Sequence, residues 1–515
     1  MDVAQNRRTV WVKKILNCLR EQVKKQIIKW LKEQVYCERI TAFILHFVVI
    51  PILSVWVGYL FFMSIGKDEN GTQYLIWLTA GVVGWYFLFR RTKAAELNAR
   101  ATEQGLTVDR LTHATKQLKS KELFIRLGGV LSLEQIAITD EEESKKIAHI
   151  FASFIRKRAT EKSGEVLETE EQFYTHRMQN LDIEASVNAL ALIASNLGKQ
   201  EQFQDYFKEV KYHLCNLQDI DLRGLWFVKT DLTGFDFARA DLRGARLIKT
   251  ILSRANLNSA NLSNAQSEEV TLIRTSLIDA DLSGARLEGA GISRADLTRS
   301  NLVGVKLAGA DLAHAKLNGA NLTEAGLAGA DLTNAKLNKA NLAGAYLVGA
   351  DLANAELNRA YLAGANIMEA NLTNAKLNEA DLAGVDLAGT DLASAELNKA
   401  DLAGANMMEV NLANVELSGA NLSKALLLDA NLSEAQLESV DFSGAVLNSA
   451  ILDGANIKGS VLKNTDFSSV SLSGIQGLTQ EQVDGTYCRD ESYPVGLPDE
   501  LKPPPGRKSS MIEDE

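Results

Sequence analysis

Proline is almost missing from the body of this 515-residue chain. Of its six prolines, one is Pro51 and the other five lie at or beyond residue 494. Because proline has no backbone N–H to donate, its absence from 52–493 allows an uninterrupted hydrogen-bonded backbone there. Aromatic residues are also few, at 7% of the chain, whereas Ala and Leu are abundant. This composition predicts a core of small and medium-sized side chains.

Cysteine and catalytic motifs are equally sparse. The four cysteines, Cys18, Cys37, Cys215 and Cys488, lack the spacing of a metal site or a disulfide framework, so we expect reduced thiols facing the cytoplasm. The six histidines show no metal-ligand spacing, and no phosphate-binding glycine loop, nucleophile elbow or HExxH motif is present. His213 and Cys215 are close in sequence, but we interpret Cys215 as a small inward-facing residue. The sequence therefore predicts a protein that is not an enzyme and has no cofactor or metal site.

Charge is spread unevenly along the chain, whose net charge is −10. Residues 1–39 carry ten Lys and Arg against four Asp and Glu, whereas residues 301–476 carry ten basic against twenty acidic residues. We expect the basic end and the acidic end to meet different partners.

Two apolar runs near the start predict a membrane hairpin over residues 40–90. Residues 41–65 contain no Asp, Glu, Lys or Arg, and 25 residues can span a bilayer core of ~30 Å. A second run, YLIWLTAGVVGWYFLF, predicts a further span over about 73–90, with a buried or re-entrant helix as the alternative. Basic residues flank both outer ends, so the positive-inside rule places both termini in the cytoplasm.

The segments around this hairpin have helical patterns. Residues 1–39 place apolar residues three and four apart among many lysines, which predicts a basic amphipathic helix on the anionic inner leaflet. An ordinary helix packed on the next domain is the alternative. Residues 91–214 contain stretches such as KKIAHIFASFIRKRA with the same spacing. We expect an α-helical linker domain that caps the first coil of the array that follows.

A five-residue repeat fills the second half, as in AKLNGANLTEAGLAGADL from residue 315. From Leu217 to Leu472 every residue number ending in 2 or 7 holds the same repeat position, which makes 52 pentapeptides. This position is almost always Leu, with a small residue two places earlier. Neither a helix nor a strand has a period of five. The one polar residue at this position is Ser267, followed by two glutamates, which predicts a bulge or loop.

A second period of twenty residues lies inside the first, because AKLNGANL at 315 returns as AKLNKANL at 335 and AKLNEADL at 375. Twenty is four fives, so the simplest body is a four-sided coil with one pentapeptide per side. Coils would stack ~4.8 Å apart, each needing its neighbours to complete its hydrogen bonds and core. Every Leu would then point to the axis. The predicted core leucines include Leu317, Leu337, Leu357, Leu377 and Leu397.

Tandem A(D/N)LXX resembles the pentapeptide-repeat protein family. The resemblance implies a mainly β fold, a right-handed quadrilateral β-helix, over residues 215–476. The front of the chain is similar to membrane-anchored bacterial members with two transmembrane helices and a helical linker, through FIRLGGVLSLEQIA, IFASFIRKRA and LCNLQDIDLRGL. Residues 477–515 leave the register. There Thr479 and Gln482 predict a capped short helix that closes the last coil, followed by a disordered end.

Residues twenty apart should stack on one face of such a coil. One column is acidic, with Asn371 and Asn411 interposed, and like charges at this spacing repel, so a basic partner could select for it. The resemblance implies this use, since some soluble members imitate duplex DNA and block type II topoisomerases. The structural interpretation is that Asp and Asn form the turns of the motif. The acidic residues are Asp311, Asp331, Asp351 and Asp391.

The function that the sequence favours is a membrane-anchored scaffold or protein–protein interaction module. Its expected partners are inner-membrane lipids and an unidentified protein, in a bacterial inner membrane and without direct binding of nucleic acid. The alternative is a regulator of a nucleic-acid enzyme, such as a topoisomerase, that acts through the acidic face.

Overall fold

The computed structural model describes residues 71–160, 167, 169–198, 215–489, 492–504 and 506–507. The chain divides into two compact units, residues 1–106 and 107–515. The predicted leader helix, residues 1–39, and the first predicted span, residues 41–65, lie outside the described residues.

The second predicted span, residues 73–90, falls within α3 (Gly71–Leu118), a continuous helix of 48 residues. The backbone therefore has no boundary at residue 90, where the sequence placed the end of a membrane hairpin. No helix in the described part of the chain combines the length and the apolar character needed to cross a bilayer.

Four helices follow α3: α4 (Leu123–Thr139), α5 (Glu141–Thr160), α6 (Glu170–Gln179) and α7 (Leu181–Gly198). Helices α4, α5 and α7 pack on one another. Their contact surfaces are apolar because each helix carries large residues at helical spacing. Asp182 is buried at their centre, where the Nε atoms of Arg126 and Arg158 lie 2.6 and 3.3 Å from its Oδ2. Fully buried apolar residues are Val130, Leu133, Ile147, Phe151, Ile155, Val187 and Leu190.

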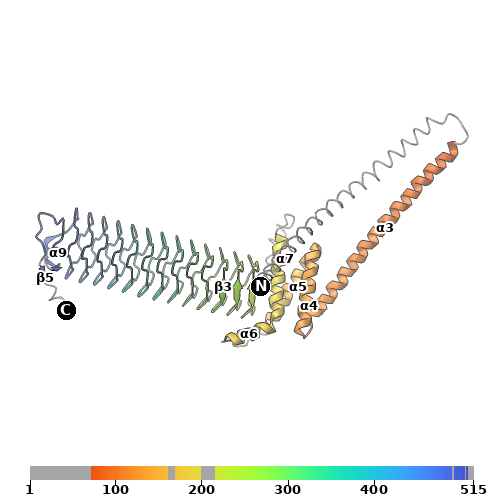
Figure 1. The fold of residues 1–515 in the computed structure, drawn as a ribbon, viewed down its shortest axis with the longest axis horizontal. Helices are drawn as coiled ribbons and strands as arrows, with labels where there is room; N and C mark the ends of the chain where they lie inside the picture. The colour runs from red at the N-terminus through yellow and green to blue at the C-terminus, as the bar shows by residue number, and fades with distance from the viewer. Residues whose placement is uncertain are drawn as a thin grey trace, which may run out of the picture. The chain divides into compact units, whose positions relative to one another are not determined.

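Residues 215–476 form a solenoid of stacked coils (Figure 1), in which one residue on each side of a coil pairs in parallel with the residue twenty positions later. Three short strands, β1 (Trp226–Val228), β2 (Arg246–Ile248) and β3 (Gln266–Glu268), form a parallel sheet in this register. Elsewhere the coils are joined by isolated parallel bridges. The predicted solenoid of four-sided coils is confirmed by this pairing.

The solenoid core consists of the repeated leucines and alanines. The N–H of Leu337 donates to the carbonyl of Glu356 in the next coil at 2.6 Å, and that of Lys336 to Ala315 in the previous coil at 2.9 Å. Each side is thus hydrogen-bonded in both directions while its Leu points inward. Leu317, Leu337, Leu357, Leu377 and Leu397 are each at most 1% exposed.

The corners of the coil are tight turns with a left-handed residue. At one corner the N–H of Ala335 donates to the carbonyl of Leu332 at 3.0 Å, and Asn334 between them has φ +58°. A positive φ at the third residue of a turn is the mark of type II geometry and suits Gly or Asn. Gly occupies many of these corners, which explains why glycine recurs in the repeat.

Ser267 does not interrupt the solenoid, so the predicted bulge or loop is wrong. Ser267 pairs with Leu247, and its neighbour Gln266 pairs with Arg286 in the following coil. A bulge requires an extra residue, whereas the five-residue count is kept here and only the side chain changes. The half-buried Ser267 hydroxyl donates to the carbonyl of Arg286 at 3.0 Å, which satisfies the polar group.

The last coils are closed by α9 (Gln480–Asp484) and a small parallel sheet of β4 (Cys488–Arg489) and β5 (Gly506–Arg507). Thr479 and Gln482 form the predicted capping box at the start of α9. The Gln482 amide also donates to the carbonyls of Ile457 and Ser460, at 3.2 and 2.9 Å, which ties the helix to the coil beneath.

Candidate interaction surface

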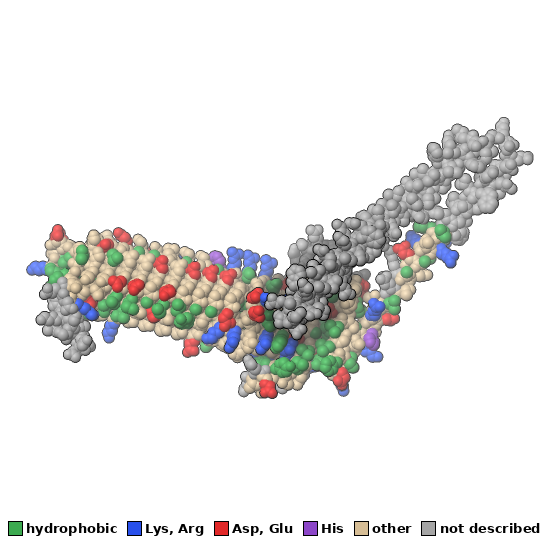
Figure 2. Space-filling model, viewed as in Figure 1, with side chains coloured by type: hydrophobic (Ala, Val, Ile, Leu, Met, Phe, Trp, Pro, Cys, Tyr) green, Lys and Arg blue, Asp and Glu red, His purple; other side chains and the backbone are tan. Residues whose placement is uncertain are grey.

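The predicted acidic column is assembled by the solenoid. Asp311 pairs with Asp331 and Asp331 with Asp351 on consecutive coils, and Asn371 separates Asp351 from Asp391. On its visible face, Figure 2 shows acidic side chains recurring along the solenoid. Three carboxylates on consecutive coils and a fourth two coils further on therefore share one side of the solenoid.

Each of these carboxylates also forms a turn. Oδ1 of Asp331 accepts the N–H of Thr333 at 2.9 Å, and Oδ1 of Asp351 accepts that of Ala353 at 3.0 Å. Asn371 donates to Asp351 at 3.0 Å, which replaces a repulsive contact with a hydrogen bond. These bonds support the structural interpretation of the motif.

A neighbouring column of asparagines forms a hydrogen-bonded ladder. The N–H of Asn358 donates to Oδ1 of Asn338 at 3.1 Å, and the same bond repeats along the column up to Ser418. Asn338 also donates to Glu356 at 3.0 Å. This bond, with a smaller effect of Lys336, lowers the pKa of Glu356. The column therefore stabilises the stack.

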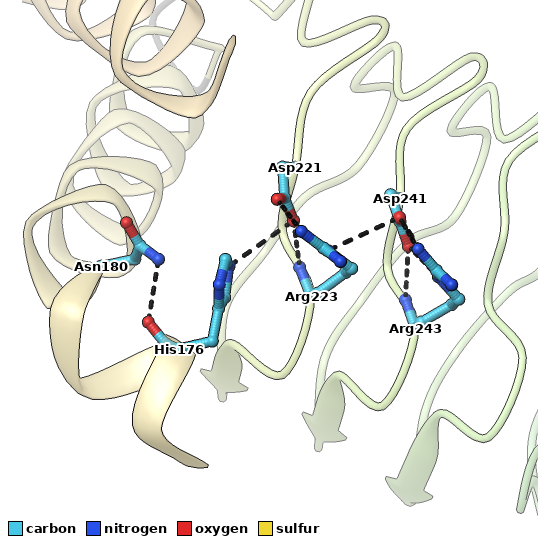
Figure 3. A network of polar contacts seen from close by, with 6 residues as sticks. All are labelled: His176, Asn180, Asp221, Arg223, Asp241 and Arg243. Carbon is cyan, nitrogen blue, oxygen red and sulfur yellow. Dashed lines mark hydrogen bonds and ion pairs between the residues drawn. The ribbon is translucent and has the colours of Figure 1, made fainter. Parts of the chain in front are cut away.

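The first coils meet the helices through buried polar contacts that the sequence did not reveal (Figure 3). Arg223 donates to Asp221 from Nε at 2.9 Å and from Nη2 at 2.7 Å, and its side chain is 3% exposed. Nε2 of His176, on α6, lies 3.6 Å from Oδ1 of Asp221. On the next coil, Arg243 pairs with Asp241 at 2.7 Å.

Asp221 is ionised in this setting although it is buried. Burial alone would raise the pKa of its carboxyl group, but hydrogen bonds from His176 and Arg223 outweigh that effect and place the pKa well below its usual range. The carboxylate thus connects α6 to the first two coils as a charged group.

Trp226 is the aromatic centre of the same junction. Its backbone N–H donates to Glu184 of α7 at 2.9 Å. The guanidinium groups of Arg177 and Arg246 lie 3.9 and 4.7 Å from the centre of its ring. Such cation–π contacts fix the ring and hold Arg246 against it.

A groove of about 500 Å³ lies between α6 and this face of the solenoid. Phe173 and Tyr174 form its helical side. An added Cβ at Gly224 would meet the carbonyl oxygen of Phe173 at 2.8 Å, so α6 lies directly on a glycine corner. The solenoid side presents Trp226, Arg246, Asn264, Gln266 and Arg286.

Sequence reasoning missed this groove because its helical side, Phe173 and Tyr174, lies outside the repeat and far from Gly224 in sequence. The available signals were the glycines at 224 and 244 and the single Trp within the array. Among the described residues, no group of three or more His, Cys, Asp or Glu could hold a metal ion.

The comparisons with known proteins agree with this geometry. The sequence model of a family described as "Pentapeptide repeats (8 copies)" matches the array without a gap. The chain therefore belongs to the pentapeptide-repeat family. No curated protein matches the chain. The matched residues are 215–254, 250–289, 290–327, 300–338, 325–364, 335–374, 370–407, 405–444 and 441–475.

The chain is also similar to solved structures, among them the following three. HetL, a pentapeptide-repeat protein involved in heterocyst differentiation regulation in Nostoc sp. strain PCC 7120, is 35% identical over 43% of this chain and 89% of HetL, with a TM-score of 0.25. Rfr23 from Cyanothece 51142 is 32% identical over 19% of this chain and 58% of its own, with a TM-score of 0.16. QnrB1, a plasmid-mediated fluoroquinolone resistance protein, is 22% identical over 39% of this chain and 92% of its own, with a TM-score of 0.18.

Proposed function

We propose that this protein is a non-enzymatic interaction scaffold whose solenoid presents fixed side chains to a partner protein. The observation that carries the proposal is the unbroken pairing of residues twenty apart along residues 215–476. Because every coil repeats the same backbone, the backbone that carries the outward side chains needs no further ordering when a partner binds.

Attachment to a bacterial inner membrane is part of the proposal. It is supported by the 25 uncharged residues of 41–65 and by the basic leader before them. The test is alkaline extraction of membranes from cells that express the full chain or a chain without residues 1–90. We expect only the full chain to stay in the membrane fraction, and release of both would remove this part of the proposal.

The scaffold itself is tested by proximity labelling from the C-terminus of the full chain in its native host. We expect a discrete set of proteins that is lost in Leu357→Lys, which places a charge in the core, and kept in Asn358→Ser, which changes the surface. Identical labelling by all three chains would contradict a scaffold that acts through its solenoid.

A regulator of a nucleic-acid enzyme is the second candidate, supported by the stacked Asp311, Asp331 and Asp351. Salt-sensitive binding of the full chain to a topoisomerase, reduced by Asp331→Asn together with Asp351→Asn, would favour it. Asn occurs in the same column, so these variants should keep the fold.

A further inference from the structure

We propose that the groove between α6 and the first coils binds an extended acidic segment of a partner protein, with Arg246 and Arg286 receiving its carboxylates. The inference rests on the proposed scaffold function, because it names one binding site on the scaffold and the chemistry of what binds there.

The groove presents basic side chains, which favours an acidic ligand. Among the described residues, the side chains of Arg246 and Arg286 form no ion pair, although Lys316, Lys336 and Lys376 at the equivalent repeat position on later coils each pair with a carboxylate one coil away. Arg246 and Arg286 share a column with Gln266 between them, and Lys306 follows. The column is thus basic over four coils and lacks a neutralising residue of its own, which favours an anionic ligand.

The spacing of the two arginines is the second argument. They lie two coils apart, about 9.6 Å at a coil spacing of ~4.8 Å. A polyproline II segment rises ~3.1 Å per residue with three residues per turn, so its residues i and i+3 lie on one face about 9.3 Å apart. An extended segment with acidic residues at every third position therefore matches the two guanidinium groups.

The aromatic side of the groove favours a peptide over a simple anion. Tyr174 is 55% exposed and Phe173 packs on the glycine corners beside it. Arg177 and Arg246 both contact the Trp226 ring, so this part of the groove is ordered before a peptide binds. Apolar side chains next to the acidic residues would pack on the exposed Tyr174 ring, whereas an inorganic anion would leave it unused.

The test uses the purified full chain in detergent and a fluorescein-labelled peptide of four Glu-Leu-Pro repeats, with binding followed by fluorescence anisotropy. The double variant Arg246→Gln with Arg286→Gln should weaken binding at least tenfold. Gln266 already occupies this column, so the substitution fits the fold. The matched control, Arg274→Gln with Arg294→Gln, removes two exposed arginines from another column and should change binding less than twofold.

Several results would overturn the inference. They are no binding by the unmodified chain, equal losses in both double variants, equal binding of a Gln-Leu-Pro peptide, or displacement of the peptide by an equal concentration of inorganic phosphate. Proximity labelling distinguishes failure of this binding site from failure of the proposed scaffold function. If the groove variant keeps the labelled partners, this site is wrong while the scaffold stands, and if no chain labels a discrete partner, the scaffold itself fails.

Discussion

The coils beside the helices and the coils in the middle of the solenoid share one backbone but are stabilised differently. In the middle, the side chains that hold the stack are repeated, as in the ladder of Asn338, Asn358 and Asn378. At the helical end, Asp221 and Arg223 form a buried pair, whereas the equivalent pair of Asp241 and Arg243 on the next coil is partly exposed. The repeat thus provides a uniform framework, and specific polar contacts are concentrated where the framework ends.

The largest loss of stability should come from a substitution in the repeated leucine core of the solenoid. Leu357→Lys places a charge at a side chain that is 0% exposed, and we expect a loss of about 4–5 kcal/mol or more in the free energy of unfolding. Urea unfolding of the full chain followed by circular dichroism measures it. The control Asn358→Ser should stay within about 0.5 kcal/mol. An unchanged midpoint in Leu357→Lys would contradict the inward leucine.

The buried pair at the helical end should be the next most sensitive. Asp221→Ala leaves Arg223 buried without its main partner, and we expect a loss of about 3 kcal/mol. Asp241→Ala, at a carboxylate that is 29% exposed, should cost about 1 kcal/mol or less. Hydrogen exchange should report the loss in the coils near Asp221 and not in the middle coils. Equal losses for both variants would show that burial does not distinguish the two pairs.

The carboxylate of Asp221 should also make the stability of the protein depend on pH. The pKa of Asp221 is lowered in the folded protein, so its contribution is present above the unfolded value of about 3.9 and is lost as the pH falls toward the folded value. The difference in urea midpoint between the unmodified chain and Asp221→Asn should therefore shrink as the pH is lowered below about 4. A difference that stays constant down to pH 2 would exclude this role for Asp221.

Two glycines with the same backbone conformation allow a further comparison between the coils beside the helices and the other coils. Gly224 and Gly304 have φ +65° and +63°, but only at Gly224 would an added Cβ meet Phe173. Gly304→Ala should cost about 1 kcal/mol through the backbone alone, and Gly224→Ala about 2 kcal/mol because α6 must move. Thermal unfolding compares them, and an equal cost would mean that α6 does not rest on this corner.

The smallest effect should come from an exposed pair between coils. Arg299 and Asp279 are 60% and 47% exposed in their side chains and lie 2.7 Å apart. Arg299→Ala should change the urea midpoint less than any destabilising substitution above, and the change should vanish in high salt because solvent and ions screen an exposed pair. A shift of the urea midpoint as large as that of Asp221→Ala would contradict a minor contribution from this exposed pair.

The features that could be predicted from the sequence are those that the five-residue repeat determines. The period of five with its inner period of twenty led to the stacked coils, and the position of Leu in each unit led to the buried column that includes Leu357. The stacking of Asp311, Asp331 and Asp351 followed from the same arithmetic. Their use by a partner remains a prediction.

Contacts between the repeat and other segments were not predictable in this way. Nothing in the local pattern around His176 shows that α6 will lie over Gly224 and Gly244, because that contact joins segments with unrelated periods. The bulge expected at Ser267 was wrong for a related reason. A polar residue at the core position predicts a change of backbone only if its side chain has no partner, and the Ser267 hydroxyl donates to the carbonyl of Arg286.

Pairing at a separation of twenty residues also constrains how such a chain can change its length in evolution. Loss of one complete coil between Asp331 and Asp351 would rejoin equivalent residues, and every later side chain would keep its direction. Loss of a single pentapeptide would instead turn everything beyond it by one side of the coil. The acidic residues downstream would then face a different direction from those upstream, with the leucine core intact.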